Sequence, residues 1–217
     1  MPAATSRPGL TRDRIVAAAI NRTDRQGVDG LSMRALASDL GVEAMSLYNH
    51  VRNKEDLIDG MVEAVLGDVA RPRAGHDWQG EMRARAQTMR AVFIAHPWAP
   101  TLVSGRINLG ATSLAMIDAI LGCLRAAGFS YVQADHIWNA LDSVTFGFHL
   151  LERTFPLKPE QYAEAARHFL PLIDPVALPH MHALSGMVAD GRHDGLNDFD
   201  FVLDRMLAAL DALPRLG

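Results

Sequence analysis

The chain of 217 residues has a single cysteine, Cys123, so no disulfide can form within one copy. Cys123 stands in the apolar stretch "AMIDAILGCL", where a small buried hydrophobic residue is its simplest role. Aromatic residues are also few, at 6%, but Leu, Ile, Val, Phe and Met are too abundant for a disordered chain. The composition therefore predicts a packed protein that is not held together by crosslinks.

Long uncharged apolar runs are missing as well. A membrane-spanning helix needs about 18 such residues, and Asp118 and Asp142 interrupt the best candidates. The opening residues, "MPAATSRPGLTRDR", lack the apolar core of a secretory signal. We therefore expect a cytoplasmic protein without a membrane partner.

Strand patterns are nearly absent, because apolar residues recur at spacings of three and four rather than in alternation. The spacing predicts an all-α fold in which a small N-terminal helical domain joins a larger helical domain. The long helices of the larger domain are expected at residues 78–95, 111–127, 130–154, 159–170 and 197–213. Between residues 171 and 195, Pro and Gly recur too often for a long regular helix, which predicts a long, partly mobile connection.

Short helices are expected in the N-terminal part, each announced by a capping residue. Thr11, Ser32 and Asn53 are the predicted N-caps, and Asp56 stands three residues after Asn53, in the position of a capping box. We expect a small N-terminal domain at residues 1–54, a connecting helix at about 54–69, and a larger C-terminal domain at 70–217.

Charge is distributed unevenly along the chain. The net charge is −4, yet residues 1–54 hold eight Lys or Arg against five Asp or Glu, so the remainder carries −7. A basic small part joined to an acidic large part favours one surface that faces phosphates and a body with another task.

The stretch "RALASDLGVEAMSLYNHV" has the spacing of a helix-turn-helix. The small Ala37 allows close helix crossing, and Gly41 makes the turn. The apolar residues of the stretch would fill a small core, leaving Glu43, Ala44, Met45, Ser46, Tyr48, Asn49 and His50 facing outward. Tyr, Asn, His and Ser side chains can contact phosphates, Asn can also read adenine, and Ala or Met can touch a thymine methyl.

Other interpretations of these features are open at this point. A helix pair with a glycine turn occurs in many all-α proteins, and Tyr48 could be a packing residue. The rival function is an all-α ligand-binding protein or enzyme without specific DNA binding. His180, His182 and His193 do not match a common zinc spacing, so we expect neither a metal nor a cofactor.

Aromatic and amphipathic residues gather on the helices of the larger part. A mostly apolar pocket with a few polar groups would suit a small effector, although each residue could equally belong to an ordinary core. The residues predicted to line such a pocket are Met89, Phe93, Trp98, Trp138, Asn139, Phe146 and His149.

Residues 10–66 resemble the N-terminal DNA-binding domain of the tetracycline-repressor (TetR) family. The motif "GVDGLSMRALASDLGV" followed by "LYNHVRNKEDL" carries the resemblance. The stretches "WQGEMRARAQTMRAVFIAHP" and "LRAAGFSYVQADHIWNALDSVTFGFHLLE" are similar to the C-terminal domain of the tetracycline repressors, less specifically. The resemblance implies a homodimer that binds a palindromic double-stranded DNA operator, as a repressor released by a small-molecule effector. An activator of the same family would have the same sequence features.

Roles follow from the matching positions. The resemblance implies that Arg34, Ala44, Met45 and Ser46 meet base edges and that Tyr48, His50 and Lys54 hold phosphates, with Asn49 between the two roles. It also implies that residues 1–54 form the DNA-binding domain and residues 70–217 the effector-binding and dimerisation domain. Within the latter, the helix at 130–154 and the terminal helix would form the dimer bundle.

Two departures from the family pattern stand out. Arg22 and Thr23 occupy positions where the family has apolar residues. The stretch "TLVSGRINLG" lacks the histidine that coordinates the drug-bound magnesium in tetracycline repressors. A metal-free effector other than tetracycline is therefore expected.

Overall fold

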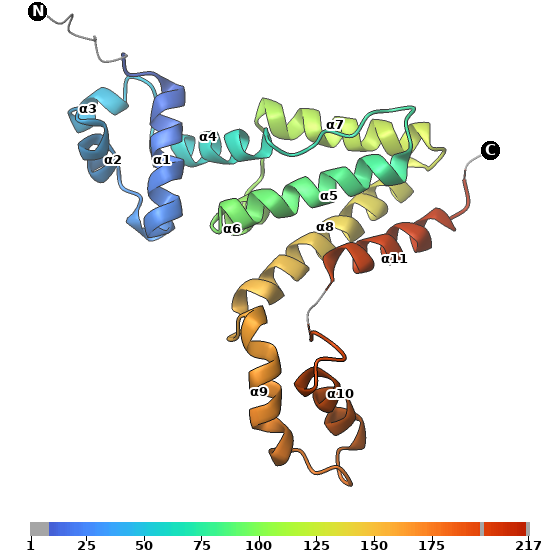
Figure 1. Cartoon of the computed structure of the whole chain (residues 1–217). Coiled ribbons are helices and arrows are strands. Elements are labelled where there is room, and N and C mark those ends of the chain that lie inside the picture. The colour runs from blue at the N-terminus through green and yellow to red at the C-terminus, as the bar shows by residue number, and fades with distance from the viewer. Residues whose placement is uncertain (1–8, 196–197, 216–217) are drawn as a thin grey trace, which may run out of the picture.

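The computed structural model describes residues 9–195 and 198–215 and shows only helices among them (Figure 1). The N-terminal group begins with α1 (Arg12–Gln26), where Thr11 accepts a hydrogen bond from the Arg14 amide. A short 3₁₀ turn, η1 (Val28–Gly30), leads to α2 (Met33–Leu40). Ser32 caps α2, and Gly41 ends it in the left-handed conformation at φ 67°. The predicted caps of both helices are confirmed.

Helix α3 (Ala44–Leu47) is shorter than the sequence pattern suggested. The amides of His50 and Val51 both donate to the Leu47 carbonyl, so residues 48–50 form a helical turn that closes α3. Asn53 is already extended, at φ −164°, as the cap of the next helix. Tyr48, Asn49 and His50 therefore lie on the turn after α3.

Helix α4 (Lys54–Leu66) leaves the N-terminal group and runs to the larger part (Figure 1). Asn53 Oδ1 accepts from the Asp56 amide at 2.8 Å, as the sequence predicted. The reciprocal half of the capping box is absent, because the Asp56 carboxylate binds Arg12 and Arg52 instead. The helix ends three residues before the expected boundary at residue 69. Its predicted apolar side is buried: Leu57, Ile58, Met61, Val65 and Leu66.

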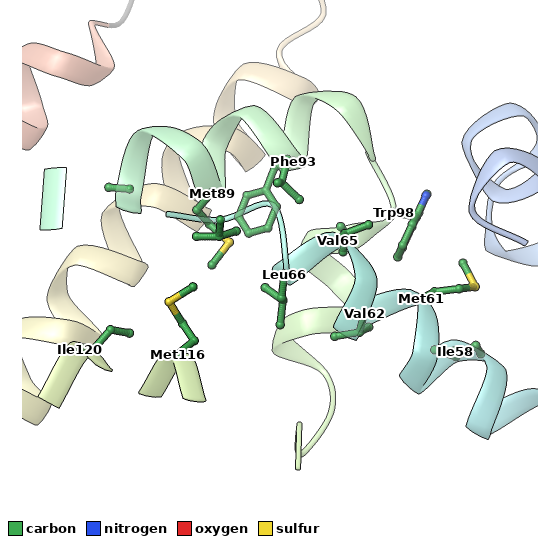
Figure 2. Close-up of a cluster of buried hydrophobic side chains, with 14 of the residues drawn as sticks. Ile58, Met61, Val62, Val65, Leu66, Met89, Phe93, Trp98, Met116 and Ile120 are labelled. Atoms are coloured by element: carbon green, nitrogen blue, oxygen red, sulfur yellow. The ribbon is translucent and has the colours of Figure 1, made fainter. Parts of the chain in front are cut away.

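The larger part is a bundle of long helices: α5 (Trp78–Ala95), α7 (Ala111–Ala126), α8 (Tyr131–Thr154) and α11 (Phe199–Asp211). Their bounds follow the predicted ranges closely, although the expected start at Asn197 lies outside the described residues. The sequence pattern missed the short α6 (Ala99–Ser104). In Figure 2, side chains of α4, α5 and α7 meet in one apolar core, where Leu66 lies near Met89 and Met116.

A helical hairpin projects from the body (Figure 1). It comprises η2 (Pro159–Gln161), α9 (Tyr162–Phe169), η3 (Leu170–Leu172) and α10 (Pro179–Ala189), and no residue of these four elements is buried. The expected irregular connection at 171–195 is thus wrong in part, because an 11-residue helix forms there. Pro179 begins that helix, where its missing amide hydrogen costs nothing, and Gly191 follows it with a φ of 78°.

Within the described residues, no single helix has both the length and the apolar composition needed to cross a membrane. Helices α7 and α8 pass that test only as a pair bent by 119°.

Candidate nucleic-acid interface and ligand-binding core

The helix-turn-helix presents its predicted contact residues to solvent. Met45 is 75% exposed and Tyr48 44% exposed, whereas Leu47 between them is fully buried. Packing thus separates core anchors from contact residues along one short segment. The remaining predicted residues are exposed or half-buried: Arg34, Ala44, Ser46, Asn49, His50 and Lys54.

The end of this segment is held by a buried carboxylate. Both terminal guanidinium nitrogens of Arg12 donate to the Asp56 carboxylate, at 3.0 and 3.1 Å. Arg12 also donates to the His50 carbonyl at 3.2 Å. The Arg52 amide donates to the same carboxylate at 2.8 Å. These bonds, the side-chain bond from Arg12 foremost, lower the pKa of Asp56 to about 2. The ionised carboxylate therefore fixes α1, the turn after α3 and the start of α4 together.

Arg22 and Thr23, the two polar residues that depart from the family pattern, form hydrogen bonds within the N-terminal group. Arg22 donates to the Gly30 carbonyl at 2.8 Å and pairs with Asp39 at 2.7 Å, which ties α1 to η1 and α2. The buried Thr23 hydroxyl donates to the Ala19 carbonyl at 2.8 Å. Both residues thus satisfy their polar groups within the N-terminal group, as buried polar groups must.

Helix α4 is fastened to the segment between α6 and α7. Arg106 donates to Glu55 and to Asp59, both at 2.6 Å, and these bonds raise its pKa. Glu63, one turn further along α4, accepts hydrogen bonds from Thr112 and Ser113 at the start of α7.

Helix α1 has its own link to the larger part. Trp98 Nε1 donates to Asp24 Oδ1 at 2.6 Å, and His96 Nδ1 lies 2.9 Å from the same oxygen. His96 and Trp98 belong to the turn between α5 and α6, so both ends of the α6 segment contact the N-terminal helices.

An aromatic cluster occupies the seam between α5 and α8. The Phe93 ring packs against Phe146 with centroids 4.6 Å apart and against His149 at 5.5 Å. His149 is 7% exposed, and its buried Nε2 has no hydrogen-bond partner among the described residues. Burial lowers the pKa of His149, so the imidazole is held in its neutral form with one nitrogen available to a ligand.

A buried ion pair lies on the same seam. Arg85, which is 3% exposed, donates to both oxygens of Asp142 at 2.6 and 3.2 Å. Trp138 Nε1 adds a third bond to this carboxylate at 2.7 Å. Sequence reasoning missed Arg85, although a basic residue between the apolar Met82 and Met89 was a visible signal.

The structure brings together part of the predicted effector pocket. Met89, Phe93, Phe146 and His149 lie at the α5–α8 seam or in the core beside it. Asn139 is instead exposed and donates to Asp135 on its own helix.

Hollows lie at three places in the described part of the chain. A cleft of about 670 Å³ lies between α1, α4 and the residues after α6, a hollow of about 550 Å³ lies in the hairpin, and one of about 300 Å³ lies beside Trp98. The six other predicted pocket residues line none of these three. The effector pocket therefore remains a prediction.

No group of three or more potential metal ligands converges in the part of the chain that the structure describes. In the stretch that lacks the tetracycline-repressor histidine, Asn108 donates to the Val103 carbonyl at 2.8 Å and closes the turn after α6. The amide thus has a structural partner.

Both parts of the chain match models of one protein family. Residues 15–61 match the family described as bacterial regulatory proteins, tetR family, and residues 71–213 match the tetracyclin repressor-like C-terminal domain. The chain belongs to the TetR family. The prediction of this family, and of its all-α fold with an N-terminal helix-turn-helix, is confirmed.

Relatives of the TetR family cover different shares of the chain. The HTH-type transcriptional repressor DrrR1 of Streptomyces coeruleorubidus is 28% identical over 98% of this chain and 81% of its own length. An HTH-type transcriptional regulator of Saccharopolyspora erythraea is 42% identical over 57% of the chain, a match that spans 53% of that protein. The structure of the Streptomyces coelicolor TetR-family protein ActR in complex with (S)-DNPA is similar, with a TM-score of 0.76, 26% identity, and coverage of 94% of this chain and 98% of ActR. ActR has also been solved in complex with actinorhodin.

The sequence did not predict several residues that join the N-terminal helices to the larger part. Asp24, Glu63 and Arg106 act across distances of about 50 to 70 residues along the chain. A weak signal existed for Glu63, a carboxylate between the apolar Val62 and Val65 of α4, but its partner could not be read from any spacing.

Proposed function

We propose that this TetR-family protein is a ligand-responsive repressor that binds a palindromic DNA operator as a homodimer and is released by a small effector. The observation that carries the proposal is the contrast between buried Leu47 and exposed Met45 and Tyr48 on α3 and the turn that follows it. This arrangement suits entry into a major groove. The protein would act in the cytoplasm, at the DNA, and not as an enzyme.

The DNA contacts divide by chemistry. Ala44, Met45 and Ser46 on α3, with Arg34 on α2, would face base edges. Tyr48, His50 and Lys54 would bind phosphates, and Asn49 could serve either purpose. Lys54 is the first residue of α4, so its charge adds to the positive N-terminal end of that helix.

The effector would enter the α5–α8 seam. Phe93, Phe146 and Met89 offer apolar contact, and the unpartnered Nε2 of His149 offers one hydrogen bond. Because His149 is neutral, the site suits a largely apolar aromatic molecule rather than an anion that would need a charged partner. The complexes of ActR with (S)-DNPA and actinorhodin support a small-molecule ligand for the shared fold.

Dimerisation would use α8 and α11. These helices pack together within one copy and also expose apolar side chains, among them Leu150, Leu151 and Phe201, each about 60% exposed. Pairing with the same helices of a second copy would cover this surface in a four-helix bundle.

The test is selection of binding duplexes from random DNA by the purified protein, followed by affinity measurements against salt. We expect a two-fold symmetric consensus with half-sites about one helical turn apart and an affinity that falls steeply with salt. A folded, dimeric preparation that selects no consensus would contradict the proposal and favour the ligand-binding alternative.

A further inference from the structure

Glu63 makes an unusual contact at the boundary between the two parts of the chain. One carboxylate oxygen accepts from the Thr112 amide at 2.7 Å, and the other accepts from the Ser113 amide at 3.0 Å and from the Ser113 hydroxyl. A side chain of α4 thereby caps the first turn of the 16-residue α7.

Helix α7 has no local substitute for this cap. Its N-cap residue is Gly110, which has no side chain, and no other side-chain cap is present at that end in the described residues. The first amides of a helix require an acceptor, and the positive end of the helix favours a negative one. The Glu63 carboxylate supplies both from a residue about 50 positions away.

Gly110 keeps the space that the carboxylate fills. A Cβ built at Gly110 would overlap Cδ and both oxygens of Glu63. The backbone of Gly110 lies at φ −70° and ψ 162°, which any residue adopts. Alanine at this position would therefore disturb the Glu63 carboxylate without straining the chain.

The contact can affect the orientation of α4 because of the position of Glu63 along that helix. The N-terminal end of α4 is joined to the helix-turn-helix through Asp56, and Glu63 lies two turns further along. Any displacement of the start of α7 must move Glu63, break its bonds, or tilt α4.

We infer that Glu63 is the positioning residue through which α7 sets the tilt of α4, and hence the separation of the two helix-turn-helix units in a dimer. The inference rests on the proposed function for its consequence on DNA. Loss of the cap should let α4 adopt several tilts. Each helix-turn-helix should still bind its half-site, but the dimer should no longer prefer one separation between the two half-sites.

The first experiment measures spacing preference on duplexes that carry the selected half-sites with their separation changed by one or two base pairs. The wild type should prefer one spacing by about tenfold or more, and Glu63→Ala should reduce that preference severalfold while affinity for a single half-site stays unchanged. Asp68→Asn, at an exposed carboxylate two residues beyond α4, is the control for charge. A merely structural role would lower single-site affinity and leave the spacing preference intact, and that result would overturn the inference.

The second experiment does not require DNA. A spin label at Arg25→Cys, in an exposed position of α1, reports the distance between the two N-terminal groups of a dimer. The native Cys123 is buried with its pKa raised to about 11, so it should not compete for the label. We expect a broader distance distribution in Glu63→Ala and in Gly110→Ala.

A cycle of these variants separates the cap from other effects. If Gly110→Ala acts by displacing the carboxylate, it should have no further effect once Glu63 is alanine. Unchanged distances in both single variants would overturn the inference even if the operator exists. Broadened distances in a protein that selects no operator would support the role of Glu63 and contradict the proposed function.

Discussion

Trp98 and Asp24 are joined by a hydrogen bond of 2.6 Å across 74 positions of sequence. The bond links the turn before α6 to α1. The bonds that Arg106 makes to α4 lie at the other end of α6. The N-terminal group is therefore held to the larger part at two separate places, and a change in α6 reaches both α1 and α4.

The hydrogen bond between Trp98 and Asp24 should stabilise the folded chain. Trp98→Phe preserves an aromatic ring in a site that is 5% exposed but removes the donor to Asp24. We expect a loss of about 1.5–3 kcal/mol in the free energy of unfolding, measured with urea, since a hydrogen bond to a charged group is worth about that much. In a double-mutant cycle with Asp24→Ala, which removes the acceptor, a coupling energy near zero would show that the bond contributes nothing.

Asp56 should make stability depend on pH in acid. Its pKa is about 2 in the folded chain and about 3.9 when unfolded, so the bonds from Arg12 and Arg52 stabilise the fold fully above pH ~4. This contribution, roughly 2 kcal/mol, is lost as the pH falls from about 4 to about 2. Asp56→Asn should lower stability at pH 7 and flatten the curve in that window. Identical slopes for variant and wild type would contradict the role of the carboxylate.

His149 should cause a second loss of stability in acid, with a different origin. Burial lowers its pKa in the folded chain, so the unfolded chain takes up a proton first as the pH falls below about 6.5. The free energy of unfolding should therefore decrease below that pH, and His149→Phe should remove this part of the decrease. Thermal unfolding at pH 8 and pH 5 gives the comparison, and equal decreases in the two proteins would refute it.

The contact residues should separate into two kinds. Lys54→Ala and Tyr48→Phe should weaken binding about equally on specific and unrelated DNA, and Lys54→Ala should reduce the salt slope by about one. Met45→Ala or Ser46→Ala should change the preferred base at particular operator positions. Competition binding with single-base operator variants measures both effects, and an unchanged preference in the latter variants would exclude base contacts by α3.

The ion pair between the buried Arg85 and the half-buried Asp142 should be sensitive to loss of either member alone. Arg85→Met leaves the Asp142 carboxylate with only the Trp138 donor, and removing one partner of a buried pair typically costs about 3–5 kcal/mol. Arg85→Met combined with Asp142→Leu should recover part of that loss. Calorimetric unfolding of the three variants decides whether the pair is coupled.

Sequence alone predicted those parts of the fold that local chemistry determines. Thr11, Ser32 and Asn53 all cap helices as predicted, because each accepts a hydrogen bond from an amide only three residues further along the chain. The family motif added the predicted DNA-contact residues, which lie within residues 34–54.

The missed features depend on neighbours that are distant in sequence. Helix α6 has Trp98 as its N-cap residue, without a side-chain capping bond, and its ends are held by Asp24 and α4. The sequence pattern did not predict α10, because Pro179 occupies its first position, where a proline is tolerated and does not break the helix. The partners of Glu63 and Arg85 lie on other helices, and no periodicity within one helix reveals them.

The cap that Glu63 provides also bears on how such proteins can be recombined. A hybrid that joins residues 1–66 of this chain to the larger part of a relative would carry Glu63 without a matching helix start, unless that relative also has a glycine where Gly110 stands. The opposite hybrid would leave α7 without an acceptor for its first amides. The workable unit of exchange is therefore the N-terminal group together with the first turn of α7, although a long stretch of chain separates them.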